Sequence, residues 1–281
     1  GLDDATRDFL DELAARGRLT VLPEHDESAE VTVGRYADCD GDLWIGDTVY
    51  GPGAPYDRSA PGPLGRIRRS DAERGEQAVQ EGLAAGLQHY AQYIVPLRLY
   101  RSGGFTLPND AVKVKLLDCF QLAPEQLEQK ANLRREMPKD ARGRYRVAPG
   151  HEIVIDVQNT QPNDLFVFLL LCNSQGQLQQ LEQDALIRGH SGHLFCADGT
   201  KKNPFIFELD DDQSWGIERL ITIATDQPGI DLGTLHQEQS LNQVIEDAMR
   251  GQARRQQPTN AAGAQWSAVQ TFIQVGEPSA P

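Results

Sequence analysis

Short blocks of alternating hydrophobic and polar residues dominate the second half of this chain. Turn-forming residues separate the blocks, which occupy His151 to Gln158, Asp164 to Cys172, Gln177 to Leu181, Pro204 to Leu209 and Ile217 to Ala224. Alternation with a period of two residues is typical of β-strands that bury one face. The stretch Leu165 to Leu171 is apolar throughout, so we expect a central strand that is covered on both faces. The pattern predicts a mainly β unit of short strands joined by turns.

Weaker patterns flank these blocks. Ala111 to Phe120 and Trp266 to Val275 have the composition of strands, and a helix is expected around Leu241 to Ala248. A basic connection, residues 131–150, leads into the first block. The third block is expected to form an edge strand. Polar residues weaken its predicted pairing, and they are Gln179, Gln180, Glu182 and Gln183.

The first part of the chain has a mixed pattern. A short helix is expected after a cap at Asp4, with Gly17 as its stop. A long helix, Asp71 to Ile94, is expected to start at a capping box formed by Ser70 and Glu73. Strands and a loop rich in glycine and proline are expected between the helices. The strands are Leu19 to Leu22, Ala29 to Tyr36 and Leu43 to Tyr50, and the loop covers residues 51–69.

These patterns divide the chain into two units. Residues 1–103 are expected to form an α/β lead-in unit of a helix, three strands and a second helix. Residues 104–281 are expected to form a β-sandwich with a late helix and a closing strand. The predicted fold class is therefore mainly β, with a small α/β lead-in unit packed on a β-sandwich.

Three motifs in the second unit resemble a known family. Ile153, Ile155 and Val157 alternate and end at Asn159. The apolar strand from Leu165 is followed by the polar turn Asn173 to Gly176, and the strand Gly216 to Thr225 is followed by Pro228 to Leu232. Together they resemble the small β-sandwich domain of unknown function behind the catalytic domain of prokaryotic caspase-like, clan CD cysteine peptidases. The resemblance covers residues 145–235, and more faintly residues 1–120.

The resemblance implies a non-catalytic role. We expect the C-terminal accessory region of a caspase-like cysteine peptidase, which regulates or scaffolds the catalytic domain or binds a protein partner. The catalytic domain is expected upstream in the same chain or in a separate chain, in a setting of cell-death or antiphage defence proteolysis. An alternative is a free-standing adaptor, inhibitor or substrate of a proteolytic pathway. No activity and no cofactor are expected for this chain alone.

The amino-acid composition limits the classes of partner that this chain is expected to bind. The 281 residues include 41 acidic and 27 basic side chains, which gives a formal charge of −14. This charge disfavours nucleic acid and anionic membranes as partners. The four cysteines show no CxxC spacing, and Cys119 and Cys172 lie in apolar runs. We therefore expect buried free thiols and a cytoplasmic location. The first residue is Gly1, so a processed product or a fragment of a longer protein is expected.

One segment carries candidate chemistry. His190, His193 and Cys196 follow one another at intervals of three residues, which on a helix would offer three ligands for a zinc-dependent hydrolase. Gly189, Ser191 and Gly192 instead predict a turn, which separates these side chains. Cys196 also lies too close in sequence to serve as the partner of a histidine on a neighbouring strand. We therefore predict no catalytic and no metal residues, and the metal-dependent hydrolase stays a second alternative.

Two further sets of charged residues are expected in loops. The acidic run Glu208 and Asp210 to Asp212 is expected to be a solvated hairpin loop, because it lacks the spacing of a calcium loop. Basic loops are candidate sites of proteolytic processing or of partner binding, since exposed flexible segments are preferred cleavage sites. Solubility and local charge pairing also explain loop arginines. The candidates are Arg66, Arg68, Arg69, Arg134, Arg135, Arg254 and Arg255.

Overall fold

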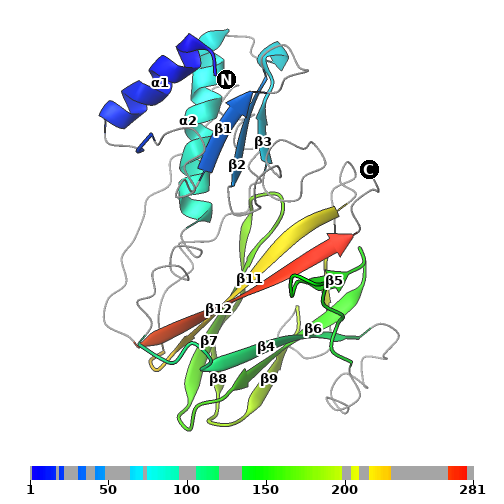
Figure 1. Ribbon diagram of the computed structural model, residues 1–281. Coiled ribbons are helices and arrows are strands. Elements are labelled where there is room, and N and C mark those ends of the chain that lie inside the picture. Colours follow the sequence, from blue (N-terminus) through cyan, green and yellow to red (C-terminus); the bar gives the residue numbers. More distant parts are fainter. Residues whose placement is uncertain are drawn as a thin grey trace. The chain divides into compact units, whose positions relative to one another are not determined.

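The computed structural model describes eleven ranges of the chain (Figure 1). They are residues 2–16, 19–21, 31–35, 42–47, 64–71, 75–94, 106–119, 135–197, 204–208, 215–228 and 265–276. Within these ranges the protein is mainly β, with three sheets and two α-helices. The described residues group into two compact units. Unit 1 contains those up to Ile94 together with Ser174–Gln177, and unit 2 contains the rest.

Unit 1 contains a three-stranded antiparallel sheet in the order β1-β2-β3. The strands are β1 (Val31–Arg35), β2 (Leu43–Asp47) and β3 (Leu64–Ile67). Gly34 lies opposite Trp44 in the register, and a Cβ atom at Gly34 would lie 2.1 Å from Cζ2 of the Trp44 ring. Because the ring occupies this space, Trp44 is only 1% exposed. An aromatic side chain that covers a cross-strand glycine fixes the register of the pair.

The expected Gly/Pro loop is shorter than its sequence pattern indicates. Its last residues form β3, which pairs with β2 from Leu64↔Gly46 to Ile67↔Leu43. The prolines of this loop all precede Leu64, so the strand itself has every backbone donor that the ladder requires. The expected strand at Leu19 to Leu22 is absent from residues 19–21, the part of it that the structure describes.

The first helix, α1 (Asp4–Ala15), is capped by Asp3. The Thr6 amide donates a hydrogen bond of 2.8 Å to Oδ1 of Asp3, and the backbone of Asp3 is extended, as an N-cap requires. The predicted cap at Asp4 was therefore wrong by one residue. Two adjacent aspartates give the same signal in sequence, and only the backbone conformation distinguishes them.

The second helix, α2 (Glu76–Tyr93), starts later than predicted. Ser70 lies in a short 3-10 helix, η3 (Arg69–Asp71), and Gly75 precedes α2 with φ 65°. This left-handed conformation favours glycine and interrupts the helical path, so the predicted start at Asp71 was wrong. The helix buries an apolar stripe that includes Val79, Leu83, Tyr90 and Tyr93.

Unit 2 contains a five-stranded sheet in the order β5-β12-β11-β7-β8. Its strands are β5 (Tyr145–Val147), β7 (Leu165–Cys172), β8 (Leu178–Ile187), β11 (Trp215–Thr225) and β12 (Trp266–Gly276). Neighbours are antiparallel except β5 and β12, which are parallel. The strand β7 pairs on both sides, and both of its faces are buried, with Phe166 as the one half-buried aromatic residue in it. The expectation that both faces of this strand are covered is confirmed.

The edge strand β8 pairs with β7 despite its polar residues. Leu171 lies opposite Gln179 and Leu170 opposite Gln180, and irregular register follows around Glu182. Asp184 adopts φ 57°, which accompanies this bulged part of the strand. The expectation of weak pairing was wrong because an edge strand needs a hydrogen-bonding partner on one side only, while its outward side chains remain polar.

A second sheet of unit 2 contains β4 (Val112–Asp118), β6 (Glu152–Asn159), β9 (Gly192–Phe195) and β10 (Phe205–Ile206). The strand β6 pairs with β4 along one edge and with β9 and β10 along the other. Its residues Ile153, Ile155 and Val157 are fully buried and belong to the core between the two sheets. The alternation in the sequence correctly identified this face.

The basic connection before β6 is more ordered than its composition indicates. Its described part, from residue 135, contains β5. The bridge Leu117↔Glu136 joins this part to β4, and the bridge Lys139↔Tyr145 lies within it. The expected block at Pro204 to Leu209 reduces to the two residues of β10 within residues 204–208. The expected helix around Leu241 to Ala248 and residues Asp210 to Asp212 lie outside the described residues.

Truncation of Phe168 tests the burial of β7. This side chain is fully buried, so Phe168→Ala should lower the free energy of unfolding by about 3 to 5 kcal/mol. Phe166 is half-buried, so Phe166→Ala should cost clearly less. Chemical denaturation of both variants measures the difference. Equal losses in the two variants would contradict the placement of β7.

Protonation of His89 should destabilise unit 1. The ring Nε2 donates to the carbonyl oxygen of Gly176 at 2.6 Å, and burial lowers the pKa of His89 although this hydrogen bond opposes the shift. The unfolded chain therefore takes up a proton below its ordinary histidine pKa of about 6.5 while the folded chain does not. The free energy of unfolding should fall as the pH drops from about 7 toward 5. His89→Gln should reduce this pH dependence, and an unchanged dependence would contradict the assignment.

Candidate functional site

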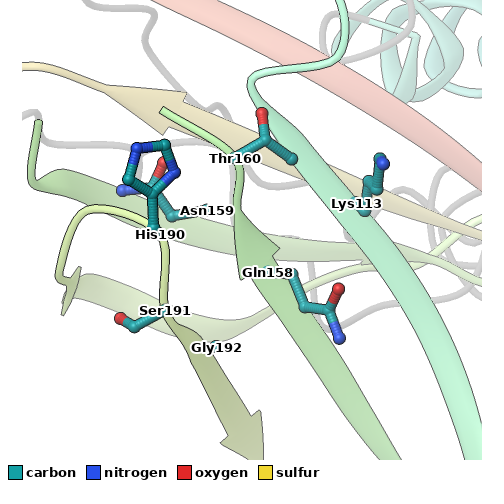
Figure 2. Close-up of a pocket in the computed structure, with 7 residues that line it drawn as sticks. All are labelled: Lys113, Gln158, Asn159, Thr160, His190, Ser191 and Gly192. Carbon is teal, nitrogen blue, oxygen red and sulfur yellow. The ribbon is translucent and has the colours of Figure 1, made fainter. Parts of the chain in front are cut away.

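An open recess lies on unit 2 at the end of β6. Its volume is about 440 Å³. The lining residues come from β4, from the end of β6 and from the turn that precedes β9, and Figure 2 shows them as Lys113, Gln158, Asn159, Thr160, His190, Ser191 and Gly192. The lining is polar, which suits a polar or charged group and disfavours an apolar ligand.

Strand register builds the floor of the recess. Gln158 lies opposite Lys113 on β4 and opposite Gly192 on β9, so one row of residues crosses three strands. These positions alternate with the core-facing residues of β6, and the row therefore lies on the outer face of the sheet. Nε2 of Gln158 donates to Oδ2 of Asp156 at 3.0 Å, which orients the amide.

Asn159 holds the wall of the recess in place. Its side chain is only 2% exposed, and Nδ2 lies 2.8 Å from the carbonyl oxygen of Asn163, 3.1 Å from that of Ile187 and 3.3 Å from that of Arg188. Its Oδ1 accepts the amide of Gln161 at 2.9 Å. One buried amide therefore satisfies backbone groups from two separate connections, which is how loops remain fixed without regular structure.

The two hydroxyl groups of the recess already donate to backbone carbonyls. Oγ1 of Thr160 lies 2.6 Å from the carbonyl oxygen of Asp110, and Oγ of Ser191 lies 2.7 Å from that of Arg188. A nucleophilic hydroxyl would instead direct its proton to a general base. In this arrangement both hydroxyl oxygens can accept hydrogen bonds from a bound group, but neither is prepared for attack.

His190 and Lys113 provide the polar donors of the recess. His190 is exposed at φ 53°, a conformation that a hydrogen bond of 2.9 Å from its amide to the carbonyl of Gln161 supports. Figure 2 shows the His190 ring and the Lys113 ammonium group on either side of the end of β6. Within the described ranges, no ion pair or hydrogen bond involves either side-chain head. The pair suits a carboxylate or another small anionic group.

The predicted separation of His190, His193 and Cys196 agrees with the structure. The His193 ring packs on the Phe195 ring with 4.6 Å between their centroids, on the face of β9 that Phe195 shares. Cys196 is 4% exposed and packs with an apolar cluster of Leu117, Cys119, Val154 and Leu194. Among the residues that the structure describes, no group of three or more His, Cys, Asp or Glu side chains is arranged to hold a metal ion.

The described thiols are buried. Cys119 and Cys172 are fully buried, and these two and Cys196 form no disulfide. Burial shields these thiols from a substrate. Cys39 lies outside the described residues.

Two of the candidate arginines are in ion pairs. Arg66 lies on β3, and its Nε and a terminal nitrogen lie 3.1 and 2.8 Å from Oδ2 of Asp42. Arg69 lies in η3, and its two terminal nitrogens are each 2.6 Å from a carboxylate oxygen, one of Asp3 and one of Glu76. Arg69 therefore joins the N-terminus of α1 to the first turn of α2.

The other candidate arginines are more peripheral. Arg68 and Arg135 are exposed, and the carbonyl of Arg135 accepts the amide of Asp118 at 2.9 Å. Arg134, Arg254 and Arg255 lie outside the described residues.

Sequence reasoning missed most of the recess. Lys113 alternates with apolar residues on a strand, and Gln158 precedes the turn at Asn159, and these are ordinary features of an exposed face. The signal that joins them is the register of three strands, which a single sequence does not contain.

Comparisons with protein-family models, with curated proteins and with solved structures give no match to this chain. No helix in the described part of the chain is long and apolar enough to cross a membrane.

The turn before β9 should not tolerate a side chain at Gly189. A Cβ atom there would lie 2.0 Å from the carbonyl oxygen of Pro162, and this neighbour is backbone that cannot rotate away. Gly189→Ala should therefore lower the free energy of unfolding by about 1 to 3 kcal/mol, the range for overpacking. Gly192→Ala is the matched control, because its Cβ would lie 3.3 Å from the Asp156 side chain. Urea denaturation compares them, and a loss as large at Gly192 would contradict the packing described for this turn.

Proposed function

We propose that this chain is a non-catalytic accessory module of a caspase-like cysteine peptidase. The module holds or regulates the catalytic domain, or binds another protein, and the recess beside Lys113 and His190 is its contact point for a polar or anionic group of the partner. The catalytic domain stands upstream in the same chain or in a separate chain. The setting is cytoplasmic proteolysis in cell death or antiphage defence.

One observation carries this proposal: the polar groups of the recess are arranged to bind and not to react. Both hydroxyl protons are directed to backbone carbonyls, and the nearby thiol of Cys196 lies in an apolar cluster. Lys113 and His190 remain as donors at the rim. This distribution supports recognition, since catalysis requires a nucleophile and a base within reach of one another.

Two further features support the proposal. The motifs around Asn159, Asn173 and Gly216 resemble the accessory domain of that peptidase family. The three described cysteines are buried and form no disulfide, which fits a reducing compartment such as the cytoplasm. A free-standing adaptor or inhibitor would use the same recess, and only the partner distinguishes the two roles.

An activity assay tests the proposal that this chain is not catalytic. The purified chain should release no more fluorophore than buffer from arginine- and aspartate-directed peptides, because its thiols are buried. Cys172→Ala and Cys196→Ala serve as controls. Turnover by the wild type that either substitution abolishes would overturn the proposal.

The coding sequence upstream of Gly1 and the neighbouring genes test whether a caspase-like partner domain exists. A caspase-like domain with a histidine and a cysteine at the ends of adjacent strands is expected there. Expressed alone, that domain should bind this chain, and Lys113→Gln with His190→Gln should weaken binding about tenfold, the loss of roughly 1.4 kcal/mol. Lys115→Gln, on the same strand outside the recess, is the control. Absence of such a domain, or an equal loss in the control, would contradict the proposal.

A further inference from the structure

A basic segment connects the two sheets of unit 2 at one corner. Residues 135–146, the basic corner, contain five Lys or Arg side chains and two carboxylates, a net charge of +3 within a chain of −14. The amide of Met137 donates to the carbonyl of Leu116 on β4, and the amide of Arg146 donates to the carbonyl of Pro138. β5 then pairs with β12. The corner is therefore anchored to both sheets.

Both carboxylates of the basic corner form ion pairs with basic side chains of the same segment. Oε1 of Glu136 accepts the Tyr145 hydroxyl at 2.8 Å and lies 3.0 Å from Nζ of Lys139, which also lies 4.3 Å from the centre of the Tyr145 ring. Burial alone would raise the pKa of Glu136, but these hydrogen bonds outweigh it and lower the pKa. Glu136 therefore stays ionised and paired.

Asp140 fixes the turn at the tip of the corner. Its Oδ1 accepts the amides of Arg142 and Arg144 at 2.8 and 2.9 Å, and its Oδ2 accepts Nε of Arg144 at 2.7 Å. Gly143 adopts φ 78° in this turn, which favours glycine. The tip therefore has a defined backbone, and its single carboxylate is fully used.

Three arginines remain on this ordered frame. Arg135, Arg142 and Arg146 are exposed, and no ion pair within the described part of the chain involves them. Because the frame is fixed by backbone hydrogen bonds, binding has to order the arginine side chains but not the backbone that carries them. Their planar guanidinium groups match carboxylates in a bidentate geometry.

We infer that the basic corner is a docking surface for an acidic polypeptide segment, held by Arg135, Arg142 and Arg146. This inference is independent of the recess and of the proposed peptidase partner. The remainder of the chain carries a net charge of −17, which repels a long polyanion such as nucleic acid. An acidic peptide of six residues is at most about 20 Å long. Charges on the rest of the surface that lie beyond the Debye length of about 8 to 10 Å are screened from it, so it experiences the corner more than the rest of the surface.

Fluorescence anisotropy with a labelled hexaglutamate peptide tests this inference. The full chain should bind the peptide, and binding should weaken as salt rises from about 50 to about 200 mM. Arg135→Gln with Arg142→Gln and Arg146→Gln should weaken binding about tenfold. Arg7→Gln with Arg16→Gln and Arg188→Gln removes the same charge elsewhere and should change binding less than about twofold.

Three results would overturn the inference. They are no binding of hexaglutamate at about 1 mM, an equal loss in the charge-matched control, or equal or tighter binding of a single-stranded oligonucleotide of the same charge. Circular dichroism verifies that the variants fold. Arg142→Gln alone, at an exposed turn position, replaces the triple variant if that variant does not fold, and a loss of affinity less than that of Arg7→Gln would then contradict the inference.

Discussion

The buried side chain of Asn159 is the interaction on which the described site of unit 2 depends. Its side-chain amide donates to the carbonyl of Asn163, which precedes β7, and to that of Ile187, which ends β8. Its backbone amide donates to the carbonyl of Ser191. Buried carbonyls without partners cost about 1 to 3 kcal/mol each, so one side chain prevents several such losses. The turns that meet at Asn159 therefore adopt one arrangement, and the recess keeps a fixed wall.

Single charged side chains also hold several groups in place in both units. In unit 1, Arg69 joins two helix termini through Asp3 and Glu76, and in unit 2, Asp140 holds a turn through Arg142 and Arg144. The carboxylates of Asp3, Glu76 and Asp140 and the guanidinium groups of Arg69 and Arg144 are used for structure, so they are not available to a partner, whereas Arg142 contributes only its backbone amide. The exposed cations that are available stand beside such ordered pairs, which separates the residues that build a surface from those that can bind at it.

The sequence predicted the β-sandwich strands because burial leaves a period of two, as Ile153, Ile155 and Val157 show. The prediction failed where two alternative structures give the same sequence pattern. Asp3 and Asp4 are equivalent cap candidates until their backbone angles are known. The start of α2 after Gly75 is likewise recognised only from the positive φ of this glycine. The recess was not predictable, since Lys113, Gln158 and Gly192 become neighbours only through strand register. The turn at Gly189 was predictable, but Gly192 begins β9, and His193 and Cys196 are separated because successive side chains along this strand point to opposite faces.

The position of β12 in the chain has a consequence for synthesis. This strand pairs with β11 along its whole length and also with β5, which precedes it by more than a hundred residues. Until the ribosome has released residues 266–276, β11 has an unpaired backbone edge with apolar neighbours on both sides. Such edges are sites of association with other nascent chains. Unit 2 therefore completes this sheet only after residues 266–276 have been synthesised.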